Sequence, residues 1–207
     1  MIFKLYNKHI FPHLLNQVMQ TPSLMDARRE LLLPLKGNCL EIGFGTGLNL
    51  AFYQNLSSLY ALEPSEELWQ LAQSRLAQTG FNVEQIVGYA EAIPLEDESV
   101  DHIVSTWTMC SIAPLEAALA EVHRVLKPEG TFHFVEHVLS DQSNIQKWQN
   151  LLTPVQKKLA DGCHLNRNIE HLVQQASFEF IEKNYFSAHG IPKIGQRMLL
   201  ARVKKKK

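Results

Sequence analysis

Short apolar runs alternate with amphipathic patterns through the middle of the chain. Apolar runs bounded by turn residues predict strands, and apolar residues spaced three and four apart predict helices with one buried face. The predicted strands are residues 38–42, 58–62, 83–87, 100–106 and 131–137, and the predicted helices begin near Leu48, Ser65 and Pro114. Strands that alternate with helices of this length indicate right-handed βαβ units and a mostly parallel sheet.

The last third of the chain follows a different pattern. Helices are predicted over residues 144–159, with a break at Pro154, and over residues 168–176. Two further strands, 178–186 and 197–203, are separated by about ten residues, which suits an antiparallel pair at a sheet edge. We therefore expect a doubly wound α/β fold: a seven-stranded, mostly parallel sheet with helices on both faces and an antiparallel C-terminal strand.

Both ends of the chain carry distinct patterns. Residues 10–19 place apolar side chains at helical spacing, which predicts a helix packed over the core rather than lying on a membrane surface. The four lysines at 204–207 predict a frayed, solvated tail rather than a membrane or RNA contact.

Composition narrows the class of protein. The 207 residues fit one domain, and the net charge of −1 argues against nucleic acid as a partner. No apolar run approaches the roughly 18 residues of a membrane span, and we expect neither a signal peptide nor stable membrane insertion. Cys39, Cys110 and Cys163 lie far apart without CxxC spacing, which argues against disulfides and a zinc site and favours the cytoplasm.

The strongest local signal is Glu41-Ile42-Gly43-Phe44-Gly45-Thr46-Gly47, between a predicted strand and helix. Glycine allows tight turns and close approach of a ligand, and open α/β sheets bind ligands at the carboxyl ends of their strands. A dinucleotide fingerprint would need glycine where Leu48 stands. Glu63 ends the next strand, 20 positions after Gly43, where its carboxylate can accept hydrogen bonds from both hydroxyls of a ribose.

With Ala-Glu-Ala-Ile-Pro at 90–94, Ser-Val-Asp at 99–101 and residues 121–130, this loop resembles class I S-adenosylmethionine-dependent methyltransferases of the type 11, UbiE-like kind. The resemblance covers most of residues 38–137. It implies a Rossmann-like fold, S-adenosylmethionine as cofactor and S-adenosylhomocysteine as product. The cofactor-binding residues that it implies are Gly43, Gly45 and Gly47 for the methionine and ribose portion, Glu41 for the loop and the amino group, Glu63 for the ribose diol, Pro64, Ala90 and Glu91 for the adenine, and Thr106 and Trp107 along the methyl path.

The resemblance also divides the chain. Residues 1–207 form a single methyltransferase domain, with an N-terminal helical cap at 1–36 and a cofactor-binding core at 37–137. An acceptor-side helical insert follows at 138–176, then a strand pair at 177–203 and the lysine tail at 204–207.

A narrower likeness concerns the acceptor. Tyr-Asn at 6–7, Glu-His-Val at 136–138, a helix with a tryptophan, and Asp-Gly-Cys-His-Leu-Asn-Arg at 161–167 resemble methyltransferase-like thiol S-methyltransferases. This likeness implies a small thiol acceptor. We expect four residues beside it: Tyr6, Trp148, Cys163 and His164. A thiol of pKa near 8.5 needs only a positive field or a weak base. The candidates are His137, Asp161 and Arg167, and no catalytic residue is assigned among them.

One metal motif is excluded. His133-Phe134-Val135-Glu136-His137 matches a zinc-protease pattern that works on a helix. Here the segment is a predicted strand, which would separate the two histidines by about 13 Å. Zinc–nitrogen bonds of about 2.1 Å cannot bridge that distance, so we expect no metal.

We therefore expect an enzyme that methylates a small molecule, preferably a thiol. The alternatives are carbon or oxygen methylation of a quinone-like or lipid acceptor, and a regulatory module that binds S-adenosylmethionine without turnover. A blocked acceptor pocket would favour the regulatory module. The pattern indicates no oligomeric state.

Overall fold

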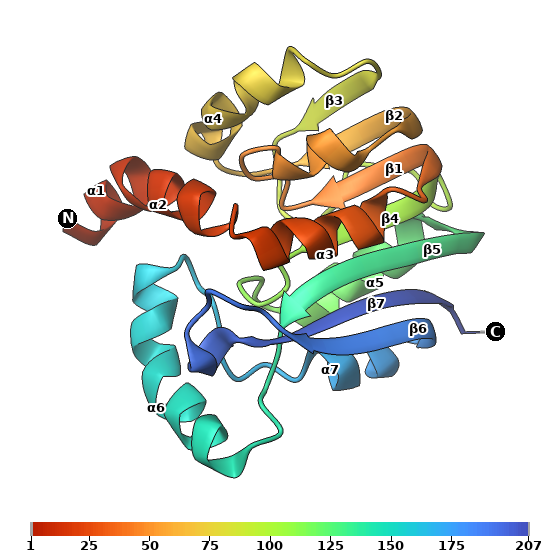
Figure 1. The fold of residues 1–207 in the computed structure, drawn as a ribbon. Helices are drawn as coiled ribbons and strands as arrows, with labels where there is room; N and C mark the ends of the chain where they lie inside the picture. Colours follow the sequence, from red (N-terminus) through yellow and green to blue (C-terminus); the bar gives the residue numbers. More distant parts are fainter. Residues whose placement is uncertain (1, 207) are drawn as a thin grey trace.

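A single seven-stranded sheet organises residues 2–206, which the computed structural model describes, with side chains from residue 5 onward (Figure 1). The strand order is β3-β2-β1-β4-β5-β7-β6. β7 is antiparallel to both of its neighbours, and the other pairs are parallel. This confirms the predicted fold class. The strands are β1 (Lys36–Ile42), β2 (Asn55–Leu62), β3 (Asn82–Ile86), β4 (Val100–Thr106), β5 (Leu126–His137), β6 (Phe178–Ser187) and β7 (Arg197–Lys205).

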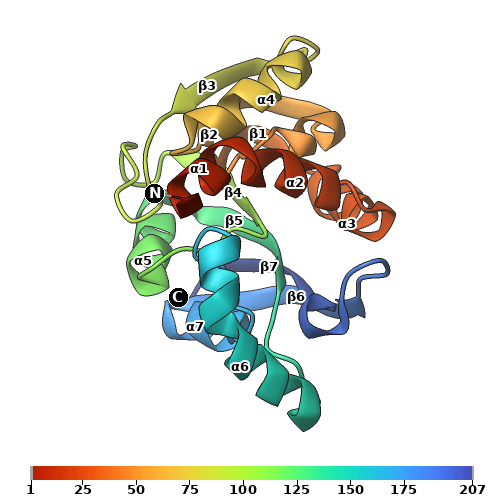
Figure 2. The same ribbon diagram turned by 90° about the vertical axis from the view of Figure 1, so that its left-hand side faces the viewer.

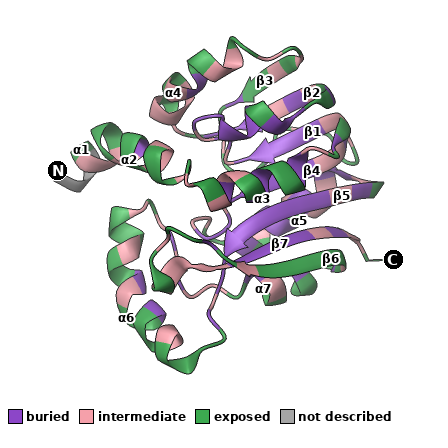
Figure 3. Cartoon of the chain, viewed as in Figure 1, coloured by how far each residue is buried: buried purple, intermediate pink, exposed green. Residues whose placement is uncertain are grey.

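Helices cover both faces of the sheet. α3 (Pro22–Leu32), α4 (Glu66–Leu76) and the 3₁₀ helix η1 (Leu48–Phe52) pack on one face, while α5 (Leu115–Val125) and α7 (Ile169–Gln175) pack on the other (Figure 2). Adjacent residues of the central strands alternate between the two cores: Ile103 faces the α5 side and Val104 the α3 side. Strands buried on both faces are the rule for parallel sheets, because the crossover helices cover them (Figure 3).

Three helices lie beyond the carboxyl ends of the parallel strands. α1 (Ile2–His9) and α2 (Phe11–Val18) lie on one side of this end, and α6 (Ser143–Leu159) lies on the other (Figures 1 and 2). The sheet order reverses direction between β1 and β4, so the loops after these two strands diverge and leave a crevice at this end. The fold thus places the loop after β1 at the position where ligands of such sheets bind.

The segment at 10–19 differs from its prediction. α2 forms there, but Ile10, Leu14 and Val18 stay about half exposed, so the helix does not pack over the core. Its apolar face borders the crevice instead. Within residues 2–206, no helix combines the length and the apolar character that crossing a lipid bilayer requires.

Two further helix predictions need correction. The helix expected from Leu48 is only the five-residue 3₁₀ helix η1, because β2 already begins at Asn55 and leaves no length for an α-helix. The break expected at Pro154 does not occur, and α6 continues to Leu159. Asn150, whose carbonyl loses its helical partner at Pro154, is exposed, so water can bond that carbonyl instead.

The lysine tail is largely strand. Lys204 and Lys205 belong to β7, where they form ion pairs with Glu179 and Glu98 at 3.2 and 3.8 Å. The backbone of Lys206 donates a hydrogen bond to the carbonyl of Ser177 at 2.8 Å. The prediction of a frayed tail was therefore wrong up to residue 206, because the long-range pairing of β6 with β7 extends into the lysines. Lys207 lies outside the described residues.

Candidate active site

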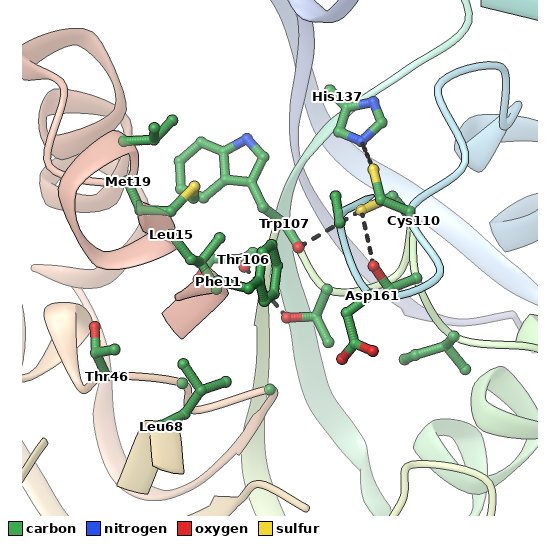
Figure 4. A pocket seen from close by; sticks show the side chains of 18 of the residues that line it. Phe11, Leu15, Met19, Thr46, Leu68, Thr106, Trp107, Cys110, His137 and Asp161 are labelled. Atoms are coloured by element: carbon green, nitrogen blue, oxygen red, sulfur yellow. Dashed lines mark hydrogen bonds between the residues drawn. The ribbon is translucent and has the colours of Figure 1, made fainter. Parts of the chain in front are cut away.

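A cavity of about 780 Å³ opens at the carboxyl ends of the parallel strands. Its walls come from the loops after β1, β2 and β4, from α2, from the end of α6 and from residues 191–198. Figure 4 shows its side chains, with Thr46 and Leu68 toward one end of the view and Cys110 and His137 toward the other. Segments that are distant in sequence therefore converge on one space.

The three glycines of the loop after β1 all have positive φ, between 58° and 74°. They differ in what surrounds them. A Cβ on Gly43 would clash with the side chain of Thr108 at 2.2 Å, and one on Gly47 would press on three neighbours at 3.1–3.3 Å. Gly47 does not line the cavity. Gly45 lines it, and a Cβ there would find no protein atom nearer than 3.8 Å. Gly45 is thus the position where a ligand can approach bare backbone.

Glu63, which directly follows β2, connects the glycine loop after β1 to the loop after β2 through hydrogen bonds. One carboxylate oxygen accepts a hydrogen bond from the backbone N–H of Gly45 at 2.8 Å, and the other accepts one from Ser65 at 2.9 Å. Burial raises the pKa of Glu63, and the nearby charge of Asp161 raises it further. Each oxygen can accept a further hydrogen bond, because a carboxylate has about four acceptor positions, and Glu63 lines the cavity.

Glu41 lies beneath the loop and is 1% exposed. Its carboxylate accepts hydrogen bonds from Asn49 at 2.9 Å and from the Tyr53 hydroxyl at 2.7 Å. Burial raises the pKa of Glu41 to about 7. Both hydrogen-bond partners belong to the segment between the glycine loop and β2. The carboxylate therefore connects β1, which precedes the loop, to the segment that follows it.

Arg28 on α3 also lines the cavity, although the sequence did not predict it as a site residue. It is 3% exposed and stacks over the Trp107 ring at 4.6 Å. Its Nε donates to Asn49 Oδ1 at 2.9 Å and a terminal nitrogen donates to the Met19 carbonyl at 2.8 Å. Burial lowers the pKa of Arg28 to about 10. Its position on the buried face of α3, among leucines and alanine, could have indicated a buried site, because arginine is rarely buried without a partner.

The remaining predicted cofactor residues come together at the same place. Trp107 follows β4 with a φ of 54°, which is uncommon for a non-glycine residue, and its backbone N–H donates to Val135 at 2.8 Å. The cavity wall contains Pro64, Ala90, Glu91, Thr106 and Trp107, and also Tyr6 of α1.

The other end of the cavity holds a cluster of sulfur and imidazole. Cys110, His137 and Cys163 are buried, line the cavity and place one ligand atom each within 4.8 Å of the others. His137 Nε2 lies 3.2 Å from Cys163 Sγ. A hydrogen bond from Cys110, together with His137, lowers the pKa of the Cys163 thiol. The fold thus brings together two cysteines that lie far apart in the sequence, so their spacing along the chain does not exclude a metal site.

Besides Gly47, three predicted residues of the acceptor side lie outside the cavity lining. Trp148 is 57% exposed on α6, and His164 faces a separate surface hollow. Arg167 donates hydrogen bonds to the carbonyls of Met109 and Ile112, so its guanidinium connects the loop after α6 to the turn after β4. Of the three candidates for a role with the acceptor proton, His137 and Asp161 line the cavity and Arg167 does not.

The zinc-protease pattern is a strand, as expected. Residues 133–137 lie in β5 and pair with β7. His133 is buried, with its Nε2 2.7 Å from Thr131 Oγ1 and its ring against His102. The two histidines of the pattern thus belong to different surroundings, and only His137 reaches the cavity.

Comparison with known proteins shows the family. A family model described as a methyltransferase domain matches residues 40–134. Thiol S-methyltransferase TMT1B of Rattus norvegicus is 33% identical over 189 residues, which cover 84% of this chain and 78% of that protein. The chain belongs to the S-adenosylmethionine-dependent methyltransferases. Thiol S-methyltransferase TMT1A of Homo sapiens is 31% identical to this methyltransferase over 204 residues, 87% of this chain and 80% of that protein.

The solved structures agree on the fold. The methyltransferase resembles a structure described as a complex between the Haloferax volcanii Trm112 methyltransferase activator and a putative methyltransferase, with a TM-score of 0.71 at 17% identity. The match covers 99% of this chain and 97% of the other. This likeness extends over the strands and helices alike, so the architecture is that of the family.

The cavity fits S-adenosylmethionine in size and in charge. Its volume lies within the range of about 300–1,000 Å³ for small-molecule sites. The bare backbone of Gly45 and the carboxylate of Glu63 suit a ribose, and the guanidinium of Arg28 suits a carboxylate. The acids Glu63 and Asp161 give a negative field that suits a sulfonium and an ammonium group.

Proposed function

We propose that this methyltransferase methylates the sulfur of a small thiol. The proposal is carried by one observation: Asp161, Cys163 and Leu165, from the segment that resembles thiol S-methyltransferases, line the same cavity as Gly45 and Glu63. The names of two relatives at 31–33% identity support the same acceptor class. Cofactor residues and the acceptor-side segment therefore face one continuous space.

The acceptor end of the cavity suits a thiol physically. Its walls are mostly apolar and include Phe11, Leu15, Met19, Ile112, Leu159 and Leu165. A thiol behaves as a small hydrophobe with a weak donor, so it enters such surroundings at less cost than an alcohol or an amine. The cavity also extends past α2 to residues 159–165, so the acceptor side is open rather than blocked.

The residues of the chain have separate tasks in this reaction. When bound, S-adenosylmethionine supplies a methyl group on a positively charged sulfur that is a good leaving group. Glu63, Gly45 and Arg28 hold the cofactor, and the apolar wall excludes water from the reacting sulfur. The acceptor proton can pass to Asp161 or His137, and a thiol of pKa near 8.5 gives it up readily.

We also propose that the enzyme acts in the cytoplasm, because all three cysteines are free thiols. Nothing in its charge supports a nucleic-acid acceptor: the net charge is −1, and the lysines of β7 form ion pairs with acidic residues.

Methyl transfer to a panel of acceptors tests the proposal. Purified protein is incubated with methyl-labelled S-adenosylmethionine and alkyl thiols, aryl thiols, a quinol and phospholipid vesicles. We expect label in the thioether products. Label only in the quinol or lipid fraction would contradict the thiol assignment and favour carbon or oxygen methylation, which the apolar wall also allows.

A further inference from the structure

Cys110, His137 and Cys163 form one cluster, and the proposed methyl transfer assigns no task to its two thiols. They come from three separate segments: the turn after β4, the end of β5 and the loop after α6. Their side chains are 3%, 8% and 8% exposed. Figure 4 shows His137 pointing toward the sulfur atoms at one end of the cavity.

The spacing of these atoms matches a metal site. Zinc binds thiolate at about 2.3 Å and imidazole at about 2.0–2.1 Å, so tetrahedral ligand atoms lie about 3.5–3.8 Å apart. Here His137 Nε2 and Cys163 Sγ are 3.2 Å apart, and all three ligand atoms lie within 4.8 Å of one another. Shifts of about an ångström or less, which side-chain rotation allows, would therefore bring all three to bonding distance of one ion.

The backbone around the cluster is already fixed. The N–H of His164 donates to the carbonyl of Cys110 at 2.9 Å, and a Cβ on Gly162 would lie 3.0 Å from the carbonyl of Ser111. Arg167 clamps the same two loops through the carbonyls of Met109 and Ile112. Binding a metal would not require these loops to fold first, which favours affinity.

The carboxylate of Glu136 fixes the turn that carries Cys110 from the other side. It accepts hydrogen bonds from the backbone N–H groups of Thr108 and Met109, both at 2.8 Å. Glu136 is fully buried next to His137 in β5, so the strand that supplies the imidazole also positions the first thiol. Glu136 thus fixes the backbone that carries two of the three side chains.

The group is open on the side of the cavity. Among the described residues, only these three make up the cluster, and all three line the cavity. Structural zinc sites are closed by four protein ligands, whereas catalytic sites have three and keep one position free. Two cysteines and one histidine form such a three-ligand set, and the free position would face the acceptor end of the cavity.

We propose that Cys110, His137 and Cys163 bind a zinc ion whose fourth position takes the sulfur of the acceptor. The second half of this proposal rests on the proposed function. A thiol that coordinates the ion loses its proton to water or to Asp161, because the charge of the ion stabilises the thiolate. Its sulfur then forms the bond to the methyl carbon as the sulfonium carbon–sulfur bond breaks, which yields a thioether and S-adenosylhomocysteine. In this arrangement His137 is a ligand and accepts no proton.

Cobalt(II) is a suitable probe, because it occupies zinc sites and gives thiolate charge-transfer and tetrahedral absorption bands. Metal-free, reduced protein is titrated with Co²⁺ and then with Zn²⁺. We expect one Co²⁺ per chain with both bands, displaced by Zn²⁺. Cys110→Ser, His137→Gln and Cys163→Ser should each weaken Co²⁺ binding more than about 100-fold. Cys39→Ala is the matched control, because Cys39 is buried on the α3 side of the sheet and should keep both bands.

A second measurement guards against variants that do not fold. Native wild-type protein is alkylated with iodoacetamide with and without Zn²⁺, and the modified cysteines are identified by mass spectrometry. Zn²⁺ should protect Cys110 and Cys163, while modification of Cys39 reports unfolding. Absence of thiolate bands in folded wild-type protein, or equal alkylation of Cys110 and Cys163 with and without Zn²⁺, would overturn the metal site.

Coordination of the acceptor sulfur by the ion is tested by a separate measurement. Adding the thiol that serves as substrate should shift the bands of the cobalt protein. An unchanged spectrum would contradict coordination of the acceptor while leaving the metal site in place. Thiol methylation at an undiminished rate by metal-free protein would likewise overturn this half, and would leave the proposed function intact.

Discussion

At the scale of single residues, Glu63 connects the glycine loop to the cofactor. Its two oxygens already accept the N–H groups of Gly45 and Ser65, and it keeps lone pairs for a ribose diol. Glu63→Gln should therefore weaken S-adenosylmethionine binding by about 1–3 kcal/mol, roughly 5- to 150-fold in Kd, because it removes a charged hydrogen-bond acceptor. Isothermal calorimetry measures the change. Glu66→Gln, on the exposed first turn of α4, is the control, and equal affinity in both variants would remove the ribose assignment.

Gly45 differs from the other glycines of its loop, because its free space is the cavity itself. Gly45→Val should nearly abolish cofactor binding, since a branched side chain would fill that space at a backbone φ of 58°. Gly80→Val is the comparison, because a Cβ at Gly80 would meet no atom within 4 Å and this glycine lies outside the cavity lining. A folded Gly45→Val protein that binds the cofactor as the Gly80 variant does would refute the placement.

Asp161 is the exposed carboxylate at the acceptor side of the cavity. Asp161→Asn should lower kcat/KM for alkyl thiols by roughly tenfold, because these must lose a proton of pKa near 8.5. Aryl thiols ionise at lower pH, so their kcat/KM should change much less. The ratio of the two values in wild type and variant measures the effect. Equal losses for both thiol classes would mean that Asp161 takes no proton.

Local motifs and long-range packing account for which site residues could be predicted from the sequence. Gly45 and Glu63 sit in a local motif, so their positions follow from the chain itself. Arg28 and Cys110 reach the cavity only through long-range packing of α3 and of the turn after β4. Trp148 shows the reverse error: its residue type suggested a pocket wall, but α6 turns it toward solvent.

At the scale of elements, the loop after α6 depends on one side chain. Arg167 donates to two carbonyls of the turn after β4, and so holds the acceptor side in place. Arg167→Met should lower the free energy of unfolding by about 2–4 kcal/mol, because buried carbonyls lose charged donors. Urea denaturation measures this. Arg29→Met removes an exposed ion pair with Asp26 and a contact with the Phe52 ring at 5.6 Å, and should change it little. Similar unfolding free energies for the two variants would show that the hydrogen bonds of Arg167 do not stabilise this loop.

The elements themselves were largely predictable, because apolar periodicity is a local property. β4 matches its predicted bounds, and Ser65 caps α4 by accepting a hydrogen bond from Leu68 at 3.2 Å. The failures have distant causes. Pairing with β6 draws Lys204 and Lys205 into β7, and the early start of β2 limits η1 to a short 3₁₀ turn. Neither cause is visible in the local pattern.

At the scale of the whole molecule, buried ionisable groups link stability to pH. Burial lowers the pKa of His133 to about 3, and the charges of His102 and Arg202 act in the same direction. The unfolded chain therefore binds a proton below about pH 6.5 that the folded protein does not, so His133 makes stability fall as the pH drops. Between pH 7 and pH 5 this amounts to about 2 kcal/mol.

His133→Gln removes this titration while keeping a partner for Thr131. Lowering the pH from 7 to 5 should therefore reduce the unfolding free energy of the wild type by about 2 kcal/mol more than that of the variant. The comparison cancels the opposite contributions of Glu41 and Glu136, whose pKa values burial raises to about 7. Urea denaturation at both pH values supplies the numbers. A difference that does not vary with pH would show that His133 can be protonated in the folded state.

One cavity joins the cofactor loop to the proposed thiol site. The most direct test is to quantify both products of a single reaction by mass spectrometry: the S-methyl thioether from a small alkyl thiol, and S-adenosylhomocysteine. We expect equal amounts of the two products, and both should fall together in the Glu63→Gln protein. S-adenosylhomocysteine formed without thioether, or no turnover with any thiol by protein that binds the cofactor, would contradict the proposed thiol methylation.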